Sequence, residues 1–110
     1  MRLLLLTALA IVIGLSSCGS DDDLPACIDE ILTDFRVEAC EGSGELTTWN
    51  FKGELVYCFA WGACLPDQFV EIYDAECNLV CELGGIGGLT ICDGTDWATS
   101  AELEDTIYSK

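Results

Sequence analysis

A cysteine at position 18 follows a leader that prepares it for covalent modification. Arg2 precedes an almost unbroken apolar run over residues 3–15, and two serines lead directly to Cys18. The run is shorter than the roughly 20 apolar residues that a membrane-crossing helix needs, and it has the length and small-residue exit of a signal peptide. The leader therefore predicts export, with the thiol of Cys18 placed for acylation at the cleavage point.

The pattern Leu15-Ser16-Ser17-Cys18 resembles the bacterial lipoprotein signal, in which the cysteine is diacylated and becomes the first residue of the mature chain. The resemblance implies that residues 1–17 are a signal peptide that is removed and that Cys18 carries palmitate-type chains into a membrane. Several chains hold firmly, because each buried methylene contributes about 0.8 kcal/mol. An ordinary secretion signal, with a plain thiol at Cys18, is the alternative.

The residues that follow Cys18 are short, polar and acidic: Gly19, Ser20, Asp21, Asp22 and Asp23. Such a segment buries no apolar surface, so residues 18–24 are expected to form a lipid anchor and an extended tether. The serine and the acidic run are similar to the signal that sends lipoproteins of some Gram-negative bacteria to the outer face of the outer membrane. Gly19 stands where the inner-membrane retention signal has Asp. The alternative is a spacer without a sorting role.

Charge restricts the partners of the chain. Four basic and twenty acidic residues give a net charge of −16, and removal of the leader with Arg2 leaves three basic residues and a net charge of −17. A field this negative excludes nucleic acid and anionic lipid as partners bound through charge, and the only membrane contact expected is the N-terminal lipid. Cations, basic peptides or cationic substrates remain open, and so does a role in solubility alone.

Catalytic and cofactor signatures are missing from the sequence. The chain has no histidine, which excludes Ser–His and Cys–His nucleophile pairs and histidine metal sites, and it has no Cys-x-x-Cys redox motif. The glycines of residues 84–88 lack the Lys-Ser/Thr that follows in a phosphate loop, and residues 93–96 fall far short of a calcium loop. We expect no enzyme, cofactor or metal; a hydrolase that uses an unassigned carboxylate pair is the remaining catalytic alternative.

Seven cysteines follow Cys18, at positions Cys27, Cys40, Cys58, Cys64, Cys77, Cys81 and Cys92. In an exported chain they predict a disulfide framework with at most three bonds and one leftover thiol. Cys81 and Cys92 flank a glycine-rich loop that can turn back on itself, so they are the first candidate pair. Cys58 and Cys64 are the second candidate pair.

The elements that must position these groups follow from hydrophobic periodicity. Pro25 suits the first turn of a helix, and Ile28, Ile31, Leu32 and Phe35 then form one apolar stripe. This stripe predicts an N-terminal helix that packs on a core.

Two hairpins and a terminal helix are expected after it. Residues 46–51 and 54–60 predict strands around a Lys52-Gly53 turn, and residues 69–74 and 79–83 predict a second hairpin. The turn of the second hairpin usually has a left-handed backbone conformation at the position of Cys77, which favours glycine. Either Asn78 adopts that conformation instead, or a disulfide at Cys77 offsets the backbone strain there. A capping box at residues 99–102, followed by Leu103 and Ile107, predicts a short C-terminal helix.

These elements define the expected fold class. It is α+β: a small antiparallel sheet of two hairpins with an N-terminal helix and a short C-terminal helix, stabilised by disulfides. Residues 25–110 are enough for a single small cysteine-rich domain and no more.

One segment of the chain resembles a known family. Residues 71–85, with the later Cys92-Asp93-Gly94, are similar to short Gram-negative surface lipoproteins that carry a cysteine-rich domain of unknown function. The matching positions are Tyr73, Asp74, Asn78, Leu79, Val80, Cys81, Gly84, Gly85, Cys92 and Trp97. Cys77 departs from that pattern, which has Gly there. The resemblance extends over about residues 25–108 and implies export and fold, but no activity.

The function expected from the sequence is that of a non-catalytic, lipid-anchored cell-envelope protein, structural or binding, whose partner stays open. The alternative is a disulfide-pinned inhibitor of an extracellular enzyme, with residues 59–63 as a loop between Cys58 and Cys64. An inhibitor would expose Trp61 on a rigid loop, whereas a structural module would bury it.

Overall fold

The computed structural model describes residues 24–110, so Cys18, Ser20 and Asp21–Asp23 lie outside the described residues. The elements follow in the order α1 (Ala26–Glu38), β1 (Glu45–Phe51), β2 (Glu54–Ala60), β3 (Val70–Tyr73), β4 (Leu79–Leu83), β5 (Ile91–Cys92), β6 (Thr95–Asp96), α2 (Trp97–Ser100) and β7 (Ala101–Ser109). Five strands form one antiparallel sheet in the order β4-β3-β2-β1-β7, and β5 and β6 form a separate ribbon. The predicted α+β class, with its antiparallel sheet, N-terminal helix and disulfides, is confirmed.

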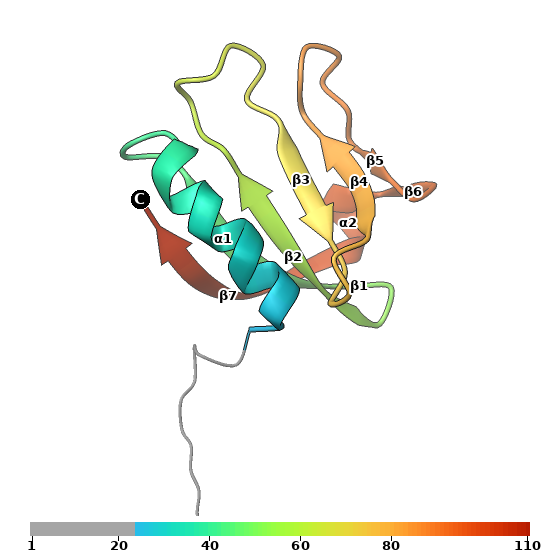
Figure 1. Ribbon diagram of the computed structural model, residues 1–110. Helices are drawn as coiled ribbons and strands as arrows, with labels where there is room; N and C mark the ends of the chain where they lie inside the picture. The colour runs from blue at the N-terminus through green and yellow to red at the C-terminus, as the bar shows by residue number, and fades with distance from the viewer. Residues whose placement is uncertain (1–23) are drawn as a thin grey trace, which may run out of the picture.

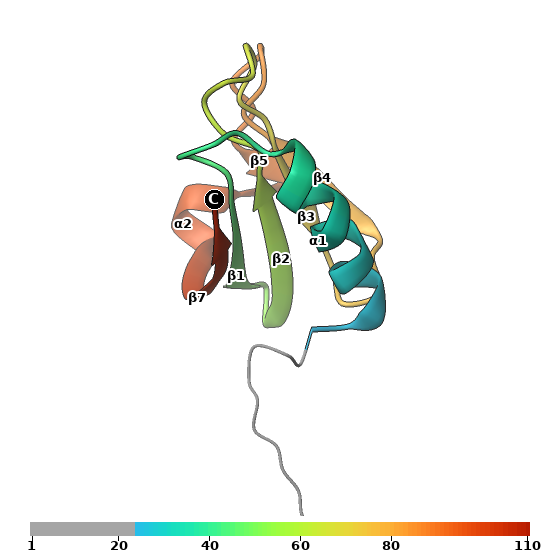
Figure 2. The same ribbon diagram turned by 60° about the vertical axis from the view of Figure 1, so that its left-hand side comes forward.

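The sheet is covered on both faces (Figure 1). Helix α1 lies across one face, and the segment with α2 lies on the other, as the turned view in Figure 2 shows. Two core clusters correspond to the two faces. The first includes Ile28, Phe35 and Phe59, and the second includes Ile72 and Cys92.

Helix α1 forms where the apolar stripe predicted it. Ile28, Leu32 and Phe35 are buried against the sheet. The ring of Phe35 meets Phe59 and Trp61 edge to face, with centroids 5.1 and 4.8 Å away. The helix therefore gains most of its stability from packing, as short amphipathic helices do.

Both predicted hairpins are present. Lys52 and Gly53, with φ of 56° and 83°, make the two-residue turn between β1 and β2. Backbone of this kind matches the right-handed twist of the flanking strands. Strands β3 and β4 form the second hairpin, with an irregularity between Ile72 and Tyr73.

The C-terminal region differs from the expectation. A second short helix exists, but α2 ends at Ser100, and the residues from Ala101 to Ser109 form strand β7 rather than a helix through Leu103 and Ile107. Strand β7 pairs with β1, where Leu103 lies opposite Trp49. A helix of two turns is marginal by itself, so nine residues of strand pairing decide the conformation.

Candidate functional site

Three disulfides join Cys27 to Cys77, Cys40 to Cys64 and Cys81 to Cys92. The Cys81–Cys92 bond, predicted from the sequence, links β4 to β5 across a Cα–Cα distance of 5.3 Å. It closes the glycine-rich loop that leaves β4, and the base of this loop therefore cannot separate from the sheet edge.

The second predicted pair, Cys58 with Cys64, is wrong. Cys58 lies inside β2 and is a buried free thiol, whereas Cys64 bonds to Cys40 at the end of α1. Strand β2 continues through Ala60 and carries Cys64 away from Cys58. Gly62 then lets the loop approach α1: a Cβ at Gly62 would lie 2.7 Å from the Cβ of Cys40.

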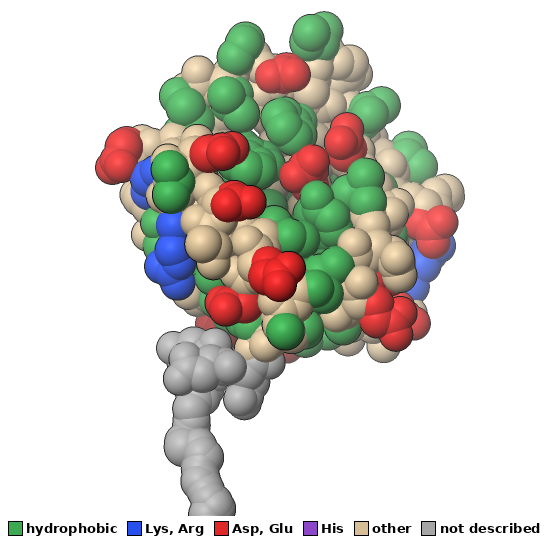
Figure 3. Space-filling view, viewed as in Figure 1, with side chains coloured by type: hydrophobic (Ala, Val, Ile, Leu, Met, Phe, Trp, Pro, Cys, Tyr) green, Lys and Arg blue, Asp and Glu red, His purple; other side chains and the backbone are tan. Residues whose placement is uncertain are grey.

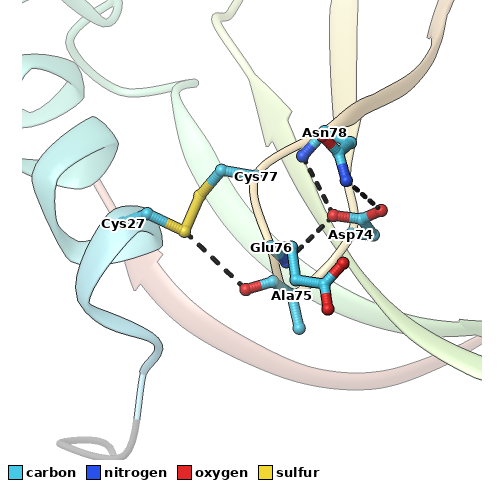
Figure 4. The surroundings of a disulfide bond; sticks show 6 residues. All are labelled: Cys27, Asp74, Ala75, Glu76, Cys77 and Asn78. Atoms are coloured by element: carbon cyan, nitrogen blue, oxygen red, sulfur yellow. Dashed lines mark hydrogen bonds between the residues drawn. A yellow bond between two sulfur atoms is a disulfide. The ribbon is translucent and has the colours of Figure 1, made fainter.

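The turn between β3 and β4 contains the strained residue that the sequence indicated (Figure 4). Cys77 has a φ of 66°, and its sulfur is bonded to Cys27 in the first turn of α1. Asp74 organises the turn, because its Oδ1 accepts hydrogen bonds from the backbone N–H of Glu76 and of Asn78, both at 2.9 Å. These bonds, that from Asn78 above all, lower the pKa of Asp74. Of the two alternatives, the disulfide at Cys77 is the one present.

A groove of about 440 Å³ lies between the β2–β3 loop and the β4–β5 loop. We call it the two-loop groove. Its lining consists of acidic, apolar and glycine residues: Asp67, Phe69, Glu71, Glu82, Leu83, Gly84, Gly85, Ile86, Gly87 and Leu89. In Figure 3, acidic and apolar side chains lie next to one another on this face of the domain, and the basic side chains visible there lie at its two margins.

Two glutamates lie side by side in the groove. Glu71 on β3 and Glu82 on β4 are direct partners in the strand register. Oε1 of Glu71 accepts hydrogen bonds from Nε1 of Trp61 at 3.2 Å and from the hydroxyl of Tyr73 at 3.3 Å. Burial, and next the charge of Glu71, raises the pKa of Tyr73, so this hydroxyl remains a donor at neutral pH.

Gly84 brings the two walls of the groove together. It has a φ of 75°, and a Cβ at this position would lie 2.9 Å from the carbonyl oxygen of Gln68. A side chain at Gly84 would therefore push the end of β4 away from the β2–β3 loop. The glycine run that the sequence identified as a flexible loop thus begins with a residue that the close approach requires.

Trp61 is packed rather than presented to solvent. Its ring is half-buried, lies next to Phe35 and stacks on Phe69 with centroids 6.4 Å apart. Trp61 therefore packs behind Phe69, one of the residues that line the groove.

The side chains that line the two-loop groove offer carboxylates and apolar surface, and the one free thiol of the described residues lies elsewhere. Cys58 is the free thiol among residues 24–110, and burial raises its pKa to about 11. Its side chain belongs to the core cluster on the face opposite α1. The groove itself combines carboxylates with apolar side chains, a chemistry that suits a cationic and partly apolar ligand.

Sequence reasoning missed this groove. Phe69, Glu71 and Glu82 appeared only as residues of predicted strands, and nothing in their spacing brings Glu71 beside Glu82 until the hairpin register is known. The acidic composition was the one available signal.

One comparison with known proteins gives a match, and it covers most of the chain. Residues 37–110 match the family described as "Domain of unknown function (DUF6970)". No curated protein and no solved structure matches the chain. The matched residues include both walls of the groove and Cys77, whereas Cys27 and most of α1 precede them.

Proposed function

The chain belongs to the DUF6970 family, and on that premise we propose that it is a non-catalytic, lipid-anchored protein of the cell envelope that binds a partner. The two-loop groove carries the binding part of this proposal, because it joins carboxylates with exposed apolar side chains, a combination that suits a cationic and partly apolar ligand. The packing of Trp61 supports a binding module over an inhibitor loop.

The anchoring part rests on the leader and on Cys18. The tether of seven residues, 18–24, spans at most about 25 Å when fully extended, which would keep the domain close to the membrane. Helix α1 begins at Ala26, at the end of the domain opposite the two long loops (Figure 1). A domain held by Cys18 would therefore point its groove away from the membrane and toward partners in the surrounding medium.

The proposed location is the outer face of a Gram-negative outer membrane. Ser20 and the acids that follow it support this location, because they are similar to a surface-sorting signal. With a net charge of −17 after leader removal, the domain would also be repelled by anionic headgroups, within the short distance that the tether allows.

Replacement of Cys18 tests the anchor. In a Gram-negative host, Cys18→Ser should give an uncleaved precursor or a soluble protein, because serine offers no thiol for acylation. Detergent partitioning and mass spectrometry of the N-terminal peptide measure the outcome, with Ser17→Ala as the control that keeps a small residue before the cysteine. A Cys18→Ser protein that still loses its leader and still enters the detergent phase would exclude the lipoprotein.

Replacement of the acidic run tests the sorting. Asp21→Ala, Asp22→Ala and Asp23→Ala together should preserve the lipid but reduce digestion by protease added to intact cells. Equal digestion before and after the change would leave the run as a spacer.

A further inference from the structure

We propose that the two-loop groove binds an extended segment of a partner protein in which a lysine or arginine is flanked by apolar residues. This inference rests on the proposed function and names the chemistry of the partner. Three properties of the groove support it: its charge, the fixed position of one carboxylate, and the apolar side chains at its rim.

The negative charges of the two-loop groove have no basic side chain beside them in the groove. Asp67, Glu71 and Glu82 line it, and no basic residue does. Like charges directly opposite each other on neighbouring strands are destabilising, and Glu71 and Glu82 occupy such positions. The ion pairs of residues 24–110, Lys52–Asp93 and Lys110–Glu41, involve neither glutamate. A cation supplied by a partner would remove this repulsion.

One of the two carboxylates is held in place before any ligand arrives. Oε1 of Glu71 is fixed by Trp61 and Tyr73, so a cation meets an oriented carboxylate instead of a mobile one. Phe69, whose ring stacks on Trp61, also lines the groove. An oriented carboxylate favours an ammonium or guanidinium group, because hydrogen bonds between opposite charges are stronger than neutral ones.

The apolar rim indicates a peptide segment rather than a small cation. The side chain of Ile86 is 93% exposed and that of Leu89 is 57% exposed, both beside the acidic groups. Apolar residues before and after the basic residue of a partner would cover these two side chains. The two loops that line the groove lie at the end of the domain away from α1's first turn, where a segment of chain has access (Figure 1).

Peptide binding to the mature full-length protein in detergent tests the inference. The probe is a fluorescein-labelled peptide Gly-Ile-Lys-Leu-Gly with blocked ends, measured by fluorescence anisotropy against the same peptide with Gln in place of Lys. The lysine peptide should bind at least about tenfold more tightly, because charge-assisted hydrogen bonds to the glutamates are lost with glutamine. Free Nα-acetyl-lysine amide should bind more weakly than the peptide, since it covers neither Ile86 nor Leu89.

Matched variants locate the binding. Glu71→Gln with Glu82→Gln should weaken the lysine peptide about tenfold, while Glu102→Gln with Glu104→Gln on β7 removes the same charge and should change it less than about twofold. Equal weakening by both pairs would reduce the effect to the general negative field and overturn the inference. Equal binding of the two peptides, or no binding by a folded protein, would also overturn it.

Thermal stability without peptide gives an independent readout. Glu82→Gln should raise the melting temperature, because it relieves the repulsion from Glu71. A lower melting temperature would assign the pair a structural role and overturn the inference. A protein that is lipidated at Cys18 but fails these tests would retain the proposed anchoring and lose only this partner.

Discussion

The two faces of the sheet are covered by segments of different kinds. Helix α1, with 13 residues, buries Ile28, Leu32 and Phe35 against one face. In the segment from Gly84 to Ser100, a two-stranded ribbon and a four-residue helix cover the other face, and the loop before them extends beyond the end of the sheet (Figure 1). Each cover has one disulfide to the β3–β4 hairpin, through Cys77 for α1 and through Cys81 for the second segment.

This difference shows two ways of holding a chain against a small sheet. A regular helix presents a continuous apolar stripe, so packing supplies most of its stability. The second cover is irregular, and Leu89 and Ile91 on it remain exposed. Both covers have a disulfide, but the second has less apolar packing beside it and so depends more on that bond. We expect substitutions in the core to affect the first cover most, and loss of a disulfide to affect the second.

The largest effect is expected from Phe35→Ala. Phe35 is fully buried and contacts three other aromatic rings, so its truncation should lower the free energy of unfolding by about 3–5 kcal/mol. Urea unfolding followed by circular dichroism measures the change. Val37→Ala, on the same helix but 78% exposed, is the control and should change it by less than about 0.5 kcal/mol. Similar losses in both would contradict a helix held by its buried stripe.

The next effect concerns the Cys81–Cys92 bond. Cys81→Ala with Cys92→Ala opens a link between residues 11 positions apart, which should cost about 3 kcal/mol in the chain-entropy model. Residues 84–88 should lose protection from hydrogen exchange before α1 does, because their glycines regain the most freedom. Thermal melts and hydrogen exchange test this. An unchanged melting temperature would mean that packing alone holds the second cover.

The same contrast explains which parts of the fold could be predicted. Helix α1 and both hairpins carry local signals, namely an apolar stripe and the Lys52-Gly53 turn, and these were confirmed. The Cys81–Cys92 bond joins cysteines 11 residues apart across one loop, whereas the bonds of Cys27 and Cys40 span 50 and 24 residues. The latter two can be assigned only when the topology places α1 beside the β3–β4 hairpin and its C-terminal end beside the β2–β3 loop.

Strand β7 and the groove depend on partners that are distant in sequence. The capping-box pattern after Thr99 favours a helix locally, and pairing with β1 overrides it. The groove requires the register that places Glu71 opposite Glu82, and it requires the approach of Gly84 to Gln68. The tether and Cys18 remain predictions from sequence.

The pH dependence of stability tests how well the core on the second face of the sheet excludes water from the Cys58 thiol. Burial raises the pKa of the Cys58 thiol from its ordinary value of 9.0 to about 11. Above pH 9 the unfolded chain loses this proton while the folded chain keeps it, so stability falls as pH rises toward 11. At pH 10 the contribution should be about 1.4 kcal/mol lower than at pH 7.

The control for this titration is Cys58→Ala, which retains the tyrosines and lacks the thiol. The stability difference between the two proteins should shrink by that amount between pH 7 and pH 10, measured by urea unfolding. A constant stability difference would show that the Cys58 thiol has the same pKa in the folded and unfolded protein, and that the core around it does not exclude water.

The smallest expected effect concerns the Cys27–Cys77 disulfide. It distinguishes the contribution of the bond from the cost of the left-handed backbone at Cys77. Cys77 has a left-handed φ of 66°, a conformation that suits glycine and costs other residues about 1 kcal/mol. When Cys27→Ala removes the bond, Cys77→Gly should therefore leave a protein about 1 kcal/mol more stable than Cys77→Ala does, measured by urea unfolding. Ala75→Gly in the same turn is the control and should not stabilise, because Ala75 is not among the residues with positive φ.

The outcome at Cys77 decides what the first cover gains from its disulfide. The residues matched to the family begin at Val37, after the bonded end of α1, so Cys77 lies inside the matched range and Cys27 lies outside it. A more stable glycine variant would show that position 77 stays left-handed without the disulfide. Asp74 and the hairpin would then impose the conformation, and Cys77 would be strained because its disulfide to α1 requires a cysteine at that position. Equal stability of the glycine and alanine variants would instead show that the turn relaxes once the bond is gone. In that case the disulfide, and not the turn, would be the source of the strain, and α1 would be held at its first turn by covalent linkage just as the second cover is.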